Sequence, residues 1–183
     1  MRRMLIAAAL AVFATSASEA QHAPTRRKVA ESIVIAASPD KVWAVLGDVE
    51  DSSWMQNVDS TREQGPDPAN STRTLTLKNG HSFVVQGRRY DAQHRSLAYS
   101  ISGNDVHDLP AGDYSASVSV EPDGSDRSKV EWKAAFYRGY PNNDPPPELN
   151  DENSEEAVRA WIHASLENLK AKVEKGKDKA KKT

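Results

Sequence analysis

The chain has 183 residues, with 24 basic and 26 acidic side chains, a formal net charge of −2 and no cysteine. This charge balance excludes a protein that binds nucleic acid through a strongly basic surface. The lack of cysteine excludes disulfides, thiolate metal sites and a cysteine nucleophile.

The first twenty residues have the three zones of a secretory signal. Two arginines precede an apolar stretch at residues 5–14, and small residues end at Ala20. A membrane anchor is the alternative, but about ten apolar residues are too few for a span, which takes roughly 20. We therefore expect cleavage near Ala20, a periplasmic location, a flexible segment at residues 21–27 and no membrane span.

One strand and two short helices are expected next. Residues 28–36 alternate between apolar and polar side chains, which is typical of a strand. Ser38 and Pro39 suit the first positions of a short helix. A second short helix is predicted at residues 51–55, where an Asp or Ser can cap it and Trp54 points inward.

The middle of the chain has the alternating pattern of β-strands separated by turns. Asn79-Gly80 is the strongest hairpin signal, because both residues accept the positive φ angles of a tight turn. Consecutive strands joined by short turns are expected to pair antiparallel. Six strands are predicted here, at residues 58–64, 71–78, 82–91, 96–103, 113–121 and 127–138.

The last part of the chain holds the longest predicted helix. Four prolines between residues 139 and 153 break the pattern, since proline fits neither a strand ladder nor a helix interior. A helix is predicted from about residue 153, with acids in its first turn and an apolar stripe that reaches Val173. Residues 175–183 are rich in lysine and are expected to form a disordered tail.

Several segments, in order, carry a resemblance to a known superfamily. They are Ile33–Trp43, Trp54, Arg73–Gly80, Leu109–Tyr114, and Val130-Glu131-Trp132 with Phe136. Together they resemble the helix-grip fold of the START-like superfamily, also called SRPBCC, which includes the polyketide cyclase type. The resemblance implies an α+β domain at residues 28–174. It also implies two short helices after the first strand and an antiparallel sheet of about six to seven strands wrapped around a long C-terminal helix.

A narrower resemblance concerns one branch of that superfamily. The export signal, the RTLTLKNG segment at 73–80 and the LPAGDY segment at 109–114 are similar to the MxaD-like group. These are small periplasmic accessory proteins encoded beside methanol dehydrogenase. The resemblance implies a non-enzymatic protein that assists electron transfer between methanol dehydrogenase and its cytochrome c partner.

The chain departs from the superfamily at two positions. The family often has a proline two residues after the second-helix tryptophan, where this chain has Gln56. Many relatives also have an inward glutamate in the strand after the Asn-Gly-type turn, and the corresponding residue here is Val85. The chain therefore lacks a carboxylate that is common in the cavities of relatives.

A sheet wrapped around a helix leaves a cavity between them, and apolar pockets with a few polar groups are the usual sites for small molecules. For each aromatic candidate the alternative is packing in the core. A buried Arg73 needs a partner, so it anchors a ligand or pairs with a carboxylate, whereas it is solvated if its strand is turned over. The candidate ligand-binding residues are Trp54, Arg73, Phe83, Tyr99, Tyr114, Trp132 and Trp161.

No catalytic, metal or cofactor pattern stands out. The five histidines show no spacing that places two ligands on one helix or strand face, so a metal site is not expected. His163 on the long helix is either a base in the cavity or, as we prefer, a partly exposed side chain. There is no GxSxG elbow and no phosphate-binding glycine loop. We therefore expect no enzyme and no cofactor, with a cyclase-like enzyme as the weaker alternative.

Charge placement suggests a partner protein. Six acids and no basic residue lie between Asp144 and Glu156, and seven lysines lie between Lys170 and Lys182. Such separation can orient a docking partner, although a solvated helix end and a solubilising tail explain it equally well. The first hypothesis is contact with a periplasmic dehydrogenase or cytochrome c through residues 140–149. The second is a carrier or sensor of a small hydrophobic ligand.

Overall fold

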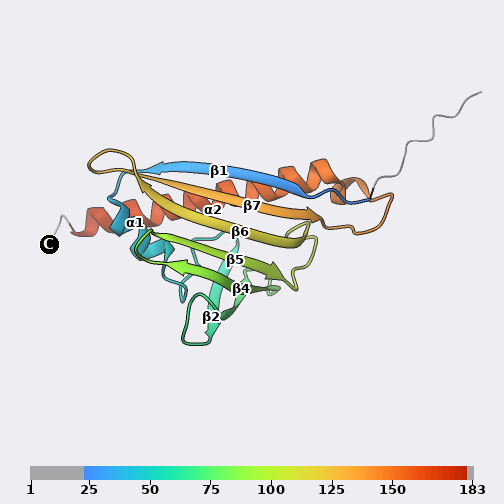
Figure 1. Ribbon diagram of the computed structural model, residues 1–183, viewed down its shortest axis with the longest axis horizontal. Coiled ribbons are helices and arrows are strands. Elements are labelled where there is room, and N and C mark those ends of the chain that lie inside the picture. The colour runs from blue at the N-terminus through green and yellow to red at the C-terminus, as the bar shows by residue number, and fades with distance from the viewer. Residues whose placement is uncertain (1–22, 181–183) are drawn as a thin grey trace, which may run out of the picture.

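The computed structural model describes residues 23–180 and contains seven strands, two α-helices and one 3₁₀ turn (Figure 1). The predicted export signal, its cleavage near Ala20 and residues 181–183 lie outside the described residues. The elements are β1 (Arg27–Ile35), α1 (Pro39–Leu46), β2 (Val58–Gln64), β3 (Thr72–Leu77), β4 (Ser82–Asp91), β5 (Ser96–Ser102), β6 (Ala111–Pro122), β7 (Ser128–Arg138), the 3₁₀ turn (Pro147–Leu149) and α2 (Asp151–Ala180).

The seven strands form one antiparallel sheet in the order β1-β7-β6-β5-β4-β3-β2. Strands β2 to β7 pair with their neighbours in sequence, whereas β1 pairs with the last strand, with Ile33 opposite Val130. The long helix α2 lies across one face of the sheet and packs most closely on β1 (Figure 1). The predicted α+β fold, an antiparallel sheet with one long C-terminal helix, is confirmed.

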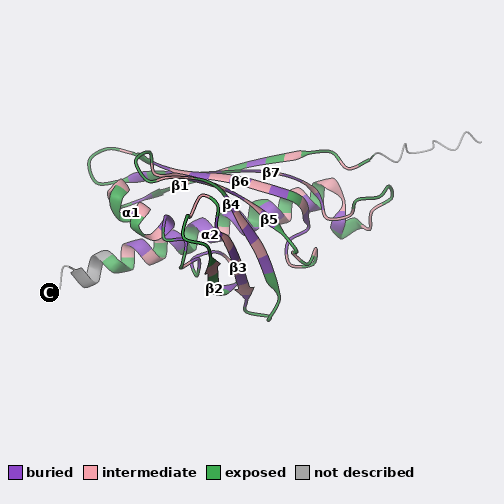
Figure 2. Cartoon of the chain, turned by 60° about the horizontal axis from the view of Figure 1, so that its bottom comes forward, coloured by how far each residue is buried: buried purple, intermediate pink, exposed green. Residues whose placement is uncertain are grey.

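The alternating pattern of the strands explains which face the helix covers. In β7, Val130, Trp132, Ala134 and Phe136 are buried, while the residues between them are exposed or half-buried. Helix α2 buries a stripe at helical spacing that faces these strands (Figure 2). Each large apolar side chain buried this way contributes about 1.5–3 kcal/mol to folding. The interface between the sheet and α2 is therefore the hydrophobic core that stabilises the fold.

The predicted second short helix at residues 51–55 is wrong, because these residues form turns. Gln56 N–H, which a helix over these residues would direct to the Ser52 carbonyl oxygen, donates instead to Ser165 Oγ on α2 at 2.9 Å. Ser52 N–H donates to Thr61 Oγ1 on β2 at 3.1 Å, which also fixes this segment. Trp54 still points inward, as predicted, and is 5% exposed.

Helix α2 begins earlier and ends later than the sequence pattern indicated. It starts at Asp151, two residues before the predicted start, because the Asn150 side chain accepts a hydrogen bond from Asn153 N–H at 2.8 Å and caps the first turn. At the other end the helix continues to Ala180, past the predicted boundary at 174. Lysine and alanine are good helix formers, which is consistent with this extension. Within residues 23–180, no helix has the length and apolar character of a membrane span.

Candidate functional site

The seven candidate residues all lie in the interior between the sheet and α2. Each is less than a tenth exposed, and each comes from a different element or turn, so only the folded chain brings them together. Trp132 of β7 is at the centre of this group. Its ring lies 5.8 Å from Trp54, 6.3 Å from Tyr99 and 5.5 Å from Trp161, measured between ring centroids.

Two further contacts extend this group, which we call the interior cluster, along the sheet. The rings of Tyr99 on β5 and Tyr114 on β6 are 6.4 Å apart, and Phe83 on β4 lies 6.4 Å from Trp161 on α2. Most of these pairs are tilted or edge-to-face, which are the favoured arrangements of aromatic rings. The role of the cluster in ligand binding stays a prediction.

The interior cluster holds most of the unpaired polar atoms of the described protein. Across residues 23–176, eight buried side-chain polar atoms have no hydrogen-bond partner, and five of them belong to the cluster. Buried polar groups are nearly always paired, and each one left unpaired costs about 1–3 kcal/mol. These five atoms are Trp54 Nε1, Arg73 Nε, Tyr99 Oη, Tyr114 Oη and Trp132 Nε1.

Arg73 is the one cationic member of the cluster. It points inward from β3 and is 7% exposed, so the solvated alternative is wrong. No carboxylate of the described residues lies within ion-pair distance of it, although Glu63 is opposite it on β2. Burial lowers the pKa of the guanidinium, and Tyr99 and Glu63 partly offset this effect. Since Val85 is the neighbour of Arg73 on β4, the position where relatives have a glutamate offers no charge partner either.

The two tyrosine hydroxyls are neutral groups at ordinary pH. Burial raises the pKa of Tyr99 well above its usual value and also raises that of Tyr114. Trp132 and Tyr99 face the Tyr114 hydroxyl and partly offset the rise in its pKa. The polar atoms of these three side chains nevertheless make no well-formed hydrogen bond with one another. Both hydroxyls can therefore donate to an oxygen atom but cannot serve as bases.

An open pocket borders this cluster. It has a volume of about 420 Å³, and we call it the mouth pocket. Its inner wall includes Phe83 and Trp161, so it reaches the edge of the cluster. A second depression, of about 480 Å³, lies on β1, β6 and β7 and includes none of the seven residues. The mouth pocket is lined by Gln56, Asn57, Leu77, Lys78, Asn79, Phe83, His107, Asp108 and Trp161.

Gln56 explains how the loop at the mouth pocket is held. Its backbone carbonyl accepts a hydrogen bond from Trp161 Nε1 at 3.2 Å, and its N–H donates to Ser165 Oγ. The proline that relatives often have at this position has no N–H to donate. The departure from the family pattern therefore fastens the loop to α2.

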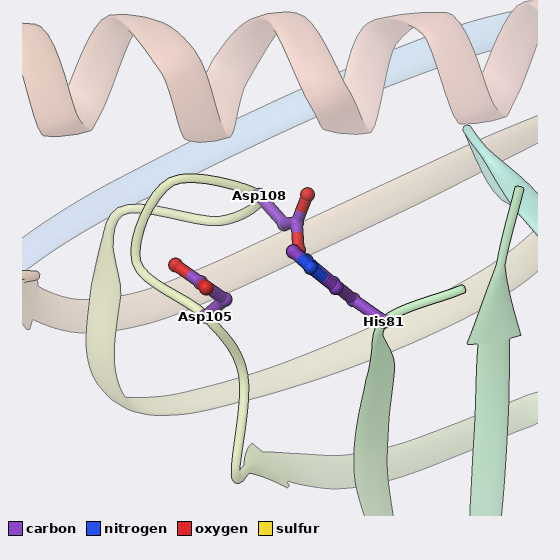
Figure 3. A group of neighbouring side chains, drawn as sticks. All are labelled: His81, Asp105 and Asp108. Atoms are coloured by element: carbon purple, nitrogen blue, oxygen red, sulfur yellow. The ribbon is translucent and has the colours of Figure 1, made fainter. Parts of the chain in front are cut away.

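Sequence reasoning missed a polar group beside the mouth pocket. His81 lies in the β3–β4 turn, and Asp105 and Asp108 lie in the loop between β5 and β6 (Figure 3). His81 Nδ1 is 2.5 Å from Asp108 Oδ2, and this hydrogen bond raises the pKa of the imidazole. Because these residues are 27 apart in the chain, no local spacing reveals them. His163, in contrast, is exposed on α2, as expected.

An antiparallel sheet wrapped around one long helix, with an aromatic interior between them, defines the helix-grip class of proteins. Residues 26–174 match the family described as polyketide cyclase / dehydrase and lipid transport, and the chain belongs to this family. A search of curated proteins returned no match.

Solved structures show the same fold at low sequence identity. An uncharacterised protein from Bacillus thuringiensis has a TM-score of 0.68 at 19% identity and covers 80% of this chain and 98% of its own. The protein XoxI from Bacillus cereus has a TM-score of 0.66 at 20% identity, covering 80% and 94%. Norcoclaurine synthase from Thalictrum flavum, in complex with dopamine and hydroxybenzaldehyde, has a TM-score of 0.63 at 15% identity, covering 95% and 98%. These similarities establish the fold.

Proposed function

We propose that the protein is a non-enzymatic binding protein that holds one small ligand with an aromatic or apolar body and an anionic oxygen group. The observation that carries this proposal is the set of five unpaired polar atoms inside an otherwise apolar cluster. All of them can donate a hydrogen bond, so their natural partner is an oxygen acceptor. A carboxylate or phenolate placed beside Arg73 would satisfy several of them together.

Two features support binding rather than catalysis. Tyr99 and Tyr114 keep their protons, and Val85 replaces the carboxylate common in relatives, so the cluster lacks an acid–base pair. The solved norcoclaurine synthase complex, which is an enzyme of the same fold, contains small aromatic molecules. That complex supports the size and class of the ligand, and loss of a turnover on Arg73→Ala would instead revive the cyclase-like alternative.

The test is a thermal-shift screen with pairs of aromatic carboxylates and their neutral amides. A ligand at 100 times its Kd stabilises the folded protein by about 2.7 kcal/mol, which raises the melting temperature measurably. We expect carboxylates to raise it more than the matched amides. Arg73→Met should remove this preference, because the guanidinium is the charge partner.

Arg88→Met is the matched control, since Arg88 is exposed on the same strand pair and donates only to Ser100 Oγ at 3.2 Å. It should leave the preference unchanged. Equal shifts for carboxylates and amides, or no shift with any compound, would contradict the proposal.

A second candidate function is the assistance of methanol oxidation in the periplasm, through contact with a dehydrogenase or its cytochrome c. The structural similarity to XoxI and the charge of the loop after β7 favour it. Arg138 fastens this loop by donating to the carbonyl oxygens of Tyr140 and Asn142 at 2.9 and 2.7 Å. Two of the six acids are engaged inside the molecule, Asp151 with Arg138 and Glu155 with Arg27. The exposed acids left for a partner are Asp144, Glu148, Glu152 and Glu156.

Salt-dependent binding tests this second function. The wild-type protein should bind purified cytochrome c with an affinity that falls as salt rises, because exposed charges are screened. Glu148→Lys with Glu152→Lys should abolish the binding, whereas Asp126→Lys in the β6–β7 turn should not. Absence of binding at low salt would contradict the accessory role without affecting the ligand proposal.

A further inference from the structure

Two loops that are far apart in sequence meet at the rim of the mouth pocket. The β3–β4 turn carries His81, and the β5–β6 loop carries Asp105 and Asp108 (Figure 3). Asn79 lies in the same turn as His81. One nitrogen or oxygen atom from each of His81, Asp105 and Asp108 lies within 4.8 Å of the others. No other group of three His, Cys, Asp or Glu side chains in the described part of the chain comes this close together.

Hydrogen bonds hold the two carboxylates in place. Asn79 Nδ2 donates to Asp108 Oδ1 at 2.7 Å, which leaves Oδ2 of the same carboxylate facing His81. The His107 N–H donates to Asp105 Oδ1 at 2.9 Å. Partners of this kind orient metal ligands in proteins, because they limit how the ligand side chains rotate.

The three side chains have the chemistry of a metal site. One imidazole and two carboxylates bind divalent transition metals such as Zn²⁺, at about 2.0–2.2 Å from each ligand atom. Two ligands of one ion can therefore be at most about 4.4 Å apart. The three atoms lie within 4.8 Å of one another, and His81 Nδ1 lies 2.5 Å from Asp108 Oδ2, so binding requires His81 to move away from Asp108 and the ligand atoms to close around the ion. We propose that His81, Asp105 and Asp108 form a binding site for one divalent transition-metal ion at the rim of the mouth pocket.

Binding of the ion replaces a proton. His81 Nδ1 lies 2.5 Å from Asp108 Oδ2, and an ion bound by both groups would replace the hydrogen bond between them. Lys78 and His107, which also line the mouth pocket, are the neighbouring basic groups. Affinity should therefore fall as the pH is lowered and His81 becomes protonated. The imidazole also favours Zn²⁺ over Mg²⁺ and Ca²⁺, which prefer oxygen ligands.

The position of the site gives the ion a structural effect. It would join the β3–β4 turn to the β5–β6 loop, beside the entrance that leads to Phe83 and Trp161. Three protein ligands also leave a coordination position open toward solvent. This site is independent of the ligand proposed for the interior cluster.

Calorimetric titration of the full-length chain, without a histidine tag and after chelator treatment, tests the proposal with ZnCl₂. We expect one saturable site, release of a proton seen as a dependence of the heat on the buffer, and at least tenfold weaker binding at pH 5 than at pH 7.5. CaCl₂ and MgCl₂ should bind at least tenfold more weakly than ZnCl₂. His81→Ala and Asp105→Asn should each weaken Zn²⁺ binding at least tenfold.

His94→Ala is the matched control, because His94 is exposed and pairs with one carboxylate, Asp91, at 2.8 Å but has no second carboxylate beside it. This variant should bind Zn²⁺ like the wild type. Absence of a saturable site in the wild type would overturn the proposal, as would equal binding by the His81 and His94 variants. Far-UV circular dichroism of each variant checks that the exposed substitutions leave the fold intact.

Discussion

Arg73 is buried without a carboxylate partner, which is uncommon because an isolated charge loses its hydration when it enters the interior. The sequence pattern of β3 predicted its inward direction. It did not predict that Tyr99, Tyr114 and Trp132 would bring further polar atoms to the same place without pairing them. The alternating pattern along one strand determines which face of the sheet a side chain occupies. Whether its polar atoms find hydrogen-bond partners depends on where the other strands and α2 place their side chains.

The first prediction follows from this burial. In ligand-free protein, Arg73→Met should raise the free energy of unfolding by about 1–3 kcal/mol, because an apolar side chain of similar length replaces an unsatisfied polar one. Urea denaturation measures the change, and the exposed Arg88→Met should alter it by less than about 0.5 kcal/mol. A clear loss of stability in Arg73→Met would mean that the guanidinium has a favourable partner.

The dependence of side-chain contacts on the tertiary fold also explains why the sequence did not predict the proposed metal site at the rim of the mouth pocket. His81, Asp105 and Asp108 belong to no motif, and their side chains meet only because the β3–β4 turn and the β5–β6 loop lie at the same end of the strands. Asn79-Gly80 did predict the turn that presents His81. The position of the facing loop could not be derived from its own residues.

At the scale of elements, most strands could be predicted because each has one buried and one exposed face. Strands β2 and β4 have the predicted bounds, and the others differ by one or two residues. The second short helix failed because Gln56 N–H, which would close its last turn, has a partner in Ser165 on α2, which no local pattern includes. Helix propensity is a weak preference that such tertiary contacts override.

The β2–β3 loop packs closely against β4 at Gly87, and this contact gives a second prediction. A Cβ atom at Gly87 would lie 2.3 Å from the Pro68 carbonyl oxygen, and Gly87 N–H already donates to the Ser71 carbonyl oxygen at 2.9 Å. Gly87→Ala should therefore destabilise the protein by about 1–3 kcal/mol, as overpacking does elsewhere. Thermal or urea denaturation measures this change.

Gly112→Ala is the control for Gly87, because its Cβ would be 3.7 Å from the nearest atom, the Arg138 carbonyl oxygen. That distance is ordinary contact, so this variant should lose much less stability. Equal losses in the two variants would show that the close approach of the loop is not the cause.

At the scale of the whole molecule, the sheet order was only partly accessible from the sequence. Short turns predict that β2 to β7 follow one another, but the pairing of β1 with β7 joins residues about a hundred positions apart, which no local pattern connects. Without disulfides, the sheet and α2 are held together by the apolar core and a few polar contacts.

One of these polar contacts, the ion pair between Asp51 and Lys172, makes the stability of the fold depend on pH in the acid range. Asp51 Oδ2 accepts a hydrogen bond from Lys172 Nζ at 2.5 Å and so ties the turn after α1 to α2, which lowers the pKa of Asp51 to about 2. A lowered pKa stabilises the folded state above the unfolded pKa, and this contribution is lost as the pH falls through about 2. Because the carboxylate is 47% exposed, its contribution is at most about 1 kcal/mol.

Asp51→Asn should therefore lower the free energy of unfolding at pH 6, and the difference from the wild type should shrink as the pH falls from 4 toward 2. Urea denaturation over this pH range measures it. The exposed Asp59→Asn should show no such trend. A difference that stays constant with pH would exclude the ion pair as the source of the stability.

The contact of three indole rings in the interior cluster has an optical consequence. The chain has four tryptophans, and the ring of Trp132 lies 5.8 Å from that of Trp54 and 5.5 Å from that of Trp161, measured between centroids. Indoles this close transfer excitation between them, so their emission and near-ultraviolet dichroism report on one shared environment. A molecule that enters between Trp161 and Trp132 would alter both signals together, which gives the protein a built-in reporter of occupancy that needs no label.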